Sequence, residues 1–285
     1  MNRPRRSVLY TPGSNARAIA KACTLPADAL ILDLEDAVAP KAKDAARAQV
    51  CAALRAGFGG RETVVRINAL DSAWGEHDLT AIAEAAPDAV LVPKVFGARD
   101  IHKVQHRLDH LNAAKAIAIW AMVETPRAIL DIGTIAEAGG RLACLVLGSN
   151  DLIKDTGGRH MAERQNLAAA MSLIVLAARA CGLCAIDGVH NDIADAEGFK
   201  AACVQARSFG FDGKTVIHPS QIDPCNAAFA PSDEEIAAAR QLIAAFEANR
   251  DKGAILFDGR MVERLHADAA RRLLALAETV AGRGR

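Results

Sequence analysis

The sequence predicts an α/β protein that folds as a (β/α)₈ barrel, the TIM barrel, with a C-terminal helical extension. Eight short apolar runs are spaced along residues 7–219, and stretches with helical periodicity separate them. Runs of this kind are typical of buried parallel strands, and their alternation with helices predicts a parallel sheet. An open doubly wound sheet is the alternative, but no G-x-G-x-x-G motif follows the first run. Eight units favour the closed barrel.

Each predicted element rests on its own local pattern. The predicted strands are residues 7–11, 29–35, 63–68, 89–94, 116–124, 142–148, 183–189 and 213–219. The predicted helices between them are residues 41–54, 99–112, 126–138, 163–180 and 192–208. These stretches are Ala-rich or amphipathic, which favours helix. The third helix opens with Pro126, which suits a first turn because its missing N–H would have no partner there.

The tail does not continue this alternation, so we divide the chain into a barrel domain, residues 1–230, and an extension, residues 231–285. The pattern of the extension predicts a helix over residues 231–250. Ser232 is its N-cap, and Glu235 completes a capping box. A hairpin or extended excursion follows at 253–262, and then a last helix at 262–280. A barrel does not need these residues for its own core. They could pack beneath the barrel, cover its mouth, or contact a neighbouring subunit. We expect the contact with a neighbouring subunit.

Composition excludes several classes of protein. The 285 residues carry 34 basic and 34 acidic side chains, a balance that argues against a nucleic-acid or membrane-surface protein. No apolar run reaches the roughly 18 residues of a transmembrane helix, and the start lacks the apolar segment of a signal peptide. The 7 cysteines are scattered and odd in number, which favours free thiols in a reducing cytoplasm. We therefore expect a cytoplasmic enzyme.

Three of the predicted strands are followed by carboxylates. Asp33, Glu35 and Asp36 close the second strand, Glu124 closes the fifth, and Asp151 follows the sixth. One such acid alone could cap the next helix or pair with a base. The carboxyl ends of parallel strands meet at one end of a barrel, however, so these acids should converge. Converging carboxylates favour a hard cation, and the sequence therefore predicts a Mg²⁺ site.

Polar side chains also follow the other predicted strands. They are Arg66, Asn68, Lys94, Asp187, His218 and Gln221. The cations suit an anionic substrate, and the neutral groups suit its orientation. The motifs G-x-S-x-G and H-E-x-x-H are both missing from the sequence, which argues against those hydrolase classes. Lys94 is placed as a Schiff-base lysine would be, but the many acids around it favour metal-assisted chemistry.

Two features near the predicted barrel mouth have alternative interpretations. Arg17 and Lys21 lie one helical turn apart after a Pro-Gly-Ser turn. They could contact a phosphate group or simply be solvated. His218 could act as a general acid, orient the substrate, or have a structural role.

Taken together, the motifs resemble one family. They are RSVLYTPGS, ALILDLEDAV, VVRIN, VLVPK, VETPRAIL, LVLGSNDL, AIDGV and GFDGKTVIHPSQI, in order over residues 6–231. This series is similar to that of the citrate lyase β-subunit-like family, in the HpcH/HpaI aldolase superfamily. The superfamily includes malyl-CoA and citramalyl-CoA lyases.

The resemblance implies a Mg²⁺-dependent carbon–carbon lyase that cleaves a malyl-, citramalyl- or citryl-type acyl thioester by a retro-Claisen reaction. The acyl carrier would be coenzyme A or an acyl carrier protein. Glu124 and Asp151 resemble the direct metal ligands, and Arg66 the residue that stabilises the enolate or the substrate carboxylate. The acids Asp33, Glu35 and Asp36 would hold waters around the metal. We expect Arg66, Asp36 and Glu263 to be catalytic and Arg66, Glu124, Arg17, Lys94 and His218 to bind substrate.

One segment departs from the family pattern. Many members carry a catalytic Asp in a G-x-M-I/V-D segment, often directed into a neighbouring subunit's site, whereas this chain has Glu263 at that position. The longer side chain leaves two alternatives open: an acyl-CoA thioester hydrolase, or a subunit of a citrate-lyase-like complex that depends on partner chains. If Glu263 acts in trans, we expect a homo-oligomer, a trimer or a dimer of trimers.

Overall fold

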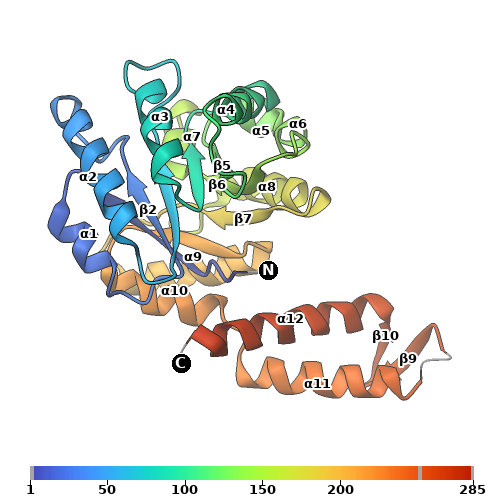
Figure 1. Ribbon diagram of the computed structural model, residues 1–285. Coiled ribbons are helices and arrows are strands. Elements are labelled where there is room, and N and C mark those ends of the chain that lie inside the picture. Colours follow the sequence, from blue (N-terminus) through green and yellow to red (C-terminus); the bar gives the residue numbers. More distant parts are fainter. Residues whose placement is uncertain (1–2, 250–251, 284–285) are drawn as a thin grey trace. The chain divides into compact units, whose positions relative to one another are not determined.

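The computed structural model describes residues 3–249 and 252–283. Contacts within the chain divide it into two compact units, a barrel unit, Arg5–Ala228, and a C-terminal unit that begins at Phe229. Figure 1 shows the elements of both in chain order. Within the described residues, no helix is both long enough and apolar enough to cross a membrane.

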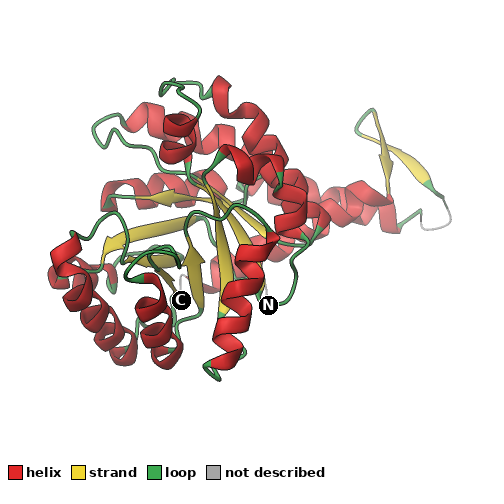
Figure 2. Cartoon of the chain, turned by 90° about the horizontal axis from the view of Figure 1, so that it is seen from above, coloured by secondary structure: helices red, strands yellow, loops and turns green. Residues whose placement is uncertain are grey.

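The barrel unit is built on eight parallel strands that close on themselves. The strands are β1 (Ser7–Pro12), β2 (Ala29–Asp33), β3 (Glu62–Arg66), β4 (Ala89–Val92), β5 (Ala118–Val123), β6 (Leu142–Leu147), β7 (Cys184–Asp187) and β8 (Gly213–Val216). Each pairs with the next, and β1 pairs with β8, so the sheet has no edge. The predicted TIM barrel is therefore confirmed, and the open doubly wound sheet is excluded by this last pairing. Figure 2 shows the strands enclosed by helices.

Helices connect the strands. The α-helices are α1 (Ala16–Ala22), α2 (Lys43–Ala56), α3 (Gly75–Ala85), α4 (Ala98–His110), α5 (Pro126–Leu130), α6 (Ile132–Ala136), α7 (Ser149–Asp155), α8 (Ala168–Ala180), α9 (Ala196–Phe209) and α10 (Ile222–Phe229). Short 3₁₀ turns occur at η1 (Pro40–Ala42), η2 (Gln165–Leu167) and η3 (Pro219–Gln221). All five predicted helices are present, with shifted ends.

Local hydrogen bonding explains two of the shifts. The helix predicted over residues 126–138 is two short helices, which meet at Asp131. The helix predicted from residue 192 begins only at Ala196, because Asp195 acts as N-cap and its side chain accepts a hydrogen bond from the backbone N–H of Gly198. The sequence analysis did not predict α1, α3, α7 or α10.

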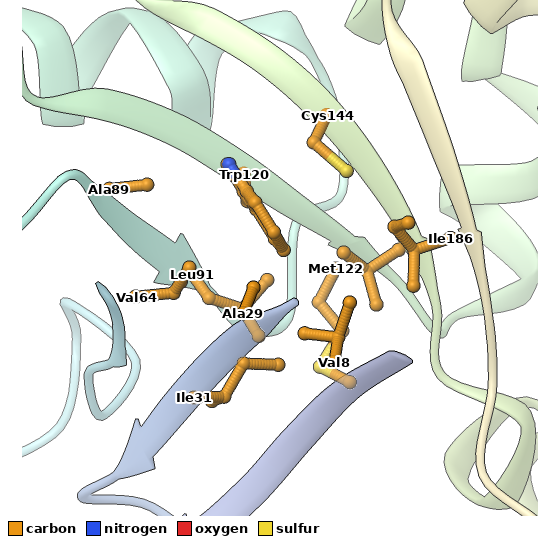
Figure 3. Close-up of a cluster of buried hydrophobic side chains, with 11 residues drawn as sticks. Val8, Ala29, Ile31, Val64, Ala89, Leu91, Trp120, Met122, Cys144 and Ile186 are labelled. Carbon is orange, nitrogen blue, oxygen red and sulfur yellow. The ribbon is translucent and has the colours of Figure 1, made fainter. Parts of the chain in front are cut away.

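The barrel interior is filled by side chains. The innermost cluster consists of Val8, Ala29, Ile31, Val64, Ala89, Leu91, Trp120, Met122, Cys144, Val146 and Ile186 (Figure 3). Alternate residues of each strand point inward, so β5 contributes Trp120 and Met122 while β2 contributes Ala29 and Ile31. Small residues such as Ala29 and Ala89 leave room for the indole of Trp120, which is fully buried. The barrel is thus a packed core, and chemistry is confined to its ends.

The C-terminal unit is a helical pair with a hairpin. It contains α11 (Asp233–Glu247), β9 (Ala254–Phe257), β10 (Arg260–Glu263) and α12 (Arg264–Arg283). The predicted capping box is confirmed, because Ser232 and Glu235 exchange side-chain-to-backbone hydrogen bonds. The predicted end of that helix, residue 250, lies outside the described residues. The hairpin turns through Asp258 and Gly259, both with positive φ, as a two-residue turn of type I′ requires.

A buried ion cluster joins the last two strands of the barrel. The ammonium group of Lys214 lies 2.7 Å from Asp187, and both side chains are fully buried. Arg164 donates to both carboxylate oxygens of Asp187, at 2.9 and 2.7 Å. Burial raises the pKa of Asp187, but Lys214 and Arg164 outweigh that effect and hold the pKa below its ordinary value. Asp187 is therefore a charged structural group, although it lies at the end of a strand, as several candidate site residues do.

Replacing Lys214 by methionine should destabilise the barrel strongly. Lys214→Met leaves the buried carboxylate of Asp187 with one cation in place of two, and loss of one partner from a buried ion pair costs about 3–5 kcal/mol. Urea denaturation measures the change in the free energy of unfolding. The control is Lys200→Met, because Lys200 forms only an exposed ion pair with Glu197, for which we expect a loss below about 0.5 kcal/mol. Equal effects of the two substitutions would contradict this interpretation.

Candidate functional site

A cavity of about 220 Å³ opens beside the carboxyl ends of the barrel strands. It is lined by Tyr10, Asp33, Asp36, Arg66, Met122, Glu124, Leu147, Gly148, Ser149, Asn150, Asp151, Val189, Asn191, Thr215 and Ile217. All of these residues belong to the barrel unit. Four acids and one base, which come from the ends of four different strands, thus share one small space. This is the end of the barrel where TIM-barrel enzymes carry out their chemistry.

Arg66 is held rigidly at the end of β3. Its guanidinium donates two parallel hydrogen bonds of 2.7 Å to the two carboxylate oxygens of Asp33, at the end of β2. Asp33 also accepts the backbone N–H groups of Glu35 and Ala37, so one carboxylate orients both the guanidinium and the loop after β2. The guanidinium lies over the ring of Tyr10, 5.0 Å from its centre. Arg66 is therefore a cation in one defined orientation.

The loop after β2 adds two more acids next to Arg66. Glu35 Oε2 and Asp36 Oδ2 lie 2.9 and 3.4 Å from its Nη1 atom. Glu35 is largely buried, whereas the Asp36 side chain is 67% exposed. Burial raises the pKa of Glu35 from 4.5 to about 8, and the charge of Arg66 only partly opposes this effect. The Lys43 ammonium group stabilises this loop, because it donates hydrogen bonds to the backbone carbonyls of Leu34 and Glu35.

A second charged group lies across the cavity. The Lys94 backbone N–H donates to Glu124 Oε1 at 2.7 Å, and its ammonium nitrogen lies 2.7 Å from Asp151 Oδ1 and 3.5 Å from Glu124 Oε1. Burial raises the pKa of Glu124, and hydrogen bonding and charge from Lys94 partly offset the rise. Gly148 packs against Glu124, since a Cβ atom there would lie 2.4 Å from Glu124 Cβ. Two carboxylates and one cation thus form a compact cluster.

The structure brings some of the predicted site residues together and leaves others apart. Asp36, Arg66, Glu124 and Asp151 line the cavity, and Lys94 contacts two of these acids. Asp151 follows β6, as the sequence analysis expected, and lies in the first turn of α7. Asp33 and Glu35 both contact Arg66, and their expected roles in holding waters stay predictions.

Three predicted residues are not part of this lining. Arg17 is exposed on α1. His218 follows β8, is exposed, and uses its Nδ1 atom in contacts with Ser220. Glu263 belongs to the C-terminal unit, where its backbone N–H donates to His266. Their expected roles stay predictions.

The sequence analysis missed several polar residues of the cavity. Tyr10 is the only tyrosine of the chain, and its hydroxyl is buried without a hydrogen-bond partner within residues 3–249 and 252–283. Burial raises the pKa of Tyr10. Asn150 and Asn191 exchange amide hydrogen bonds of 3.1 and 2.8 Å across the loops after β6 and β7. Both follow strands, in Ser-Asn-Asp and His-Asn-Asp sequences, and that position is the signal that could have identified them.

The raised pKa of Glu35 has a consequence for stability. Between about pH 4.5 and 8 the unfolded chain releases a proton that the folded chain keeps, so stability falls as the pH rises through this interval. Glu35→Gln removes the titrating group. Its free energy of unfolding, relative to the native chain, should therefore increase from pH 5 to pH 8, as measured by urea denaturation. The control is Glu84→Gln on the exposed face of α3, whose profile should run parallel to that of the native chain. A parallel profile for Glu35→Gln would refute the assignment.

Comparison with known proteins identifies the family of this chain. Residues 6–219 match the HpcH/HpaI aldolase/citrate lyase family. The (3S)-malyl-CoA thioesterase of Cereibacter sphaeroides is 47% identical over 98% of this chain and 96% of its own. The citrate lyase subunit beta of Escherichia coli is 36% identical over 97% and 94%. A crystal structure of CitE from Mycobacterium tuberculosis, in complex with magnesium, acetoacetate and coenzyme A, has a TM-score of 0.81 at 35% identity and covers 96% of this chain and 98% of that one. The chain therefore belongs to the HpcH/HpaI aldolase/citrate lyase family.

Proposed function

We propose that the chain is a Mg²⁺-dependent enzyme that acts on the coenzyme A thioester of a 3-hydroxy-dicarboxylic acid of the malyl type. The observation that carries the proposal is the cluster of Glu124, Asp151 and Lys94 beside the oriented guanidinium of Arg66. It combines two carboxylates for a hard cation with an anion-binding group in one cavity. The substrate class comes from the relatives, one a malyl-CoA thioesterase and one crystallised with magnesium and coenzyme A.

The donor set fits Mg²⁺. Glu124 and Asp151 offer only oxygen atoms, and an ammonium nitrogen already lies between them, so the position suits a positive charge. No group of three or more His, Cys, Asp or Glu side chains that could hold a metal occurs in the described part of the chain. Mg²⁺ does not require one, because it is commonly held by one or two carboxylates together with waters and substrate oxygens. When bound there it would act as a Lewis acid on substrate oxygens.

Two bonds of a malyl thioester can be broken at such a site. In the lyase reaction the 3-hydroxyl loses its proton, the C2–C3 bond breaks, and its electron pair passes to the thioester as an enolate. Protonation of C2 then yields acetyl-CoA beside glyoxylate. In hydrolysis, water adds to the thioester carbonyl, the C–S bond breaks, and coenzyme A leaves as the thiol beside malate. Both reactions place negative charge on the thioester oxygen, which Arg66 is placed to stabilise.

Hydrolysis is the first candidate outcome, because the thioesterase relative is 47% identical over 98% of the chain. Carbon–carbon cleavage, which the sequence analysis put first, is the second candidate. It is supported by the citrate lyase subunit at 36% identity, which equally supports a subunit that depends on partner chains. Glu263 is proposed as the base, delivered by a neighbouring subunit of a homo-oligomer, and this role rests on the family pattern alone.

The products distinguish these functions directly. The purified chain is incubated with Mg²⁺ and malyl-CoA, citramalyl-CoA or citryl-CoA, and the products are separated by chromatography while free thiol is measured. A hydrolase releases one thiol for each malate formed. A lyase forms acetyl-CoA and glyoxylate without free thiol from malyl-CoA. EDTA should abolish either reaction. Turnover of none of the three thioesters in the presence of Mg²⁺ would refute the proposal for the isolated chain.

Arg66 should act on the transition state in either reaction. Arg66→Lys keeps a positive charge but loses the planar guanidinium that Asp33 orients. We expect kcat to fall by about 10²–10³-fold, as for the loss of one oxyanion-stabilising donor. The control is Arg127→Lys on α5, where the arginine pairs only with Asp131 at the surface. A rise confined to KM would show instead that Arg66 binds the ground state.

A further inference from the structure

Lys94 has an unusual backbone conformation. Lys94 follows β4 and Pro93. Its φ of 50° lies in the left-handed region, which residues other than glycine and asparagine rarely adopt. The conformation directs the Lys94 N–H at the Oε1 atom of Glu124, 2.7 Å away. Strained backbone of this kind persists only where the surrounding structure holds it in place, and it gathers at functional sites.

The side chain of the same residue reaches the second acid. The Lys94 ammonium nitrogen lies 2.7 Å from Asp151 Oδ1. Its 3.5 Å contact with Glu124 is again to Oε1, the oxygen that its own N–H already binds. One residue therefore contacts both carboxylates, by its backbone and by its side chain. It uses one oxygen atom of each.

The other oxygen of each carboxylate stays available. Within residues 3–249 and 252–283, neither Glu124 Oε2 nor Asp151 Oδ2 is seen to accept a hydrogen bond. Gly148 keeps the first of them accessible, because a Cβ atom at that position would lie 2.8 Å from Glu124 Oε2. The two carboxylates thus have one oxygen engaged and one open. This is the arrangement that two ligands of a shared cation need.

We propose that Lys94 is a positioning residue that holds Glu124 and Asp151 by one oxygen each and so presents their other oxygens to the metal ion. The inference rests on the proposed Mg²⁺ site, and it assigns to Lys94 a role other than the substrate binding expected from the sequence. Outer groups that hydrogen-bond to ligating carboxylates fix their orientation, and their loss typically weakens metal binding by about 10–100-fold.

Magnesium binding without substrate tests this role. Titration calorimetry with MgCl₂ compares the native chain with Lys94→Met, which keeps the backbone N–H but loses the ammonium group. We expect Kd to rise by about 10–100-fold. Lys94→Arg keeps a cation and should lose less affinity than Lys94→Met. The matched control is Lys154→Met, which removes an exposed lysine from α7, the helix that carries Asp151, and should change Kd by less than about twofold.

Each other result overturns the inference. Tighter Mg²⁺ binding by Lys94→Met would mean that the ammonium group competes with the metal. An unchanged Kd, with a raised KM for the thioester, would mean that Lys94 serves substrate binding alone. Failure of the native chain to bind Mg²⁺ would refute the metal site itself, and with it the proposed function. Circular dichroism and thermal unfolding check that Lys94→Met is folded, and Lys94→Arg provides the comparison if it is not.

Discussion

Closure of the barrel between β1 and β8 is the constraint on which the rest of the structure depends. Ser7–Leu9 pairs with Lys214–Val216 in parallel, which leaves no free edge in the sheet. Parallel closure also brings the carboxyl ends of all eight strands to one end of the barrel. Acids that are more than a hundred residues apart in the chain, such as Asp33 and Asp151, can therefore line one cavity.

Placing so many carboxylates together requires compensating charge. Asp33, Glu35 and Glu124 are largely buried, and each would be unfavourable as an isolated anion. Arg66 neutralises the acids after β2, and Lys94 those after β5 and β6. Burial of Glu35 outweighs the charge of Arg66, which is why the pKa of Glu35 rises to about 8. The site is thus built from two ion clusters, one that orients an anion-binding group and one suited to a metal.

Lys214 and Lys94 both form ion pairs with acids of the barrel, but they serve different ends. Lys214 is fully enclosed with Asp187 and Arg164, and the single carboxylate of that cluster is engaged by both cations. Lys94 is partly exposed and contacts acids that retain open oxygens beside a cavity. Lys94 follows β4, Lys214 lies in β8, and both contact acids. The local sequence therefore does not show that their roles differ. The difference lies in whether a cavity adjoins the ion cluster.

The sequence by itself determined the eight strands, several of the helices and the fold class. Apolar runs bounded by polar residues located all eight strands, and the capping box of Ser232 and Glu235 located α11, because these patterns act over a few neighbouring residues. The position of Asp36, Arg66 and Glu124 after strands was likewise enough to bring them to one site, because a parallel barrel collects its strand ends.

Only the tertiary structure decided what each group does there. Asp33 forms two hydrogen bonds with Arg66, and Asp187, at the end of a strand, belongs to a buried ion cluster. Tyr10, which lies in an apolar run of the sequence, lines the cavity. Such roles depend on burial and on partners far away in the chain. Those are set by the register of strand pairing and by side-chain packing, and no local pattern of residues encodes them.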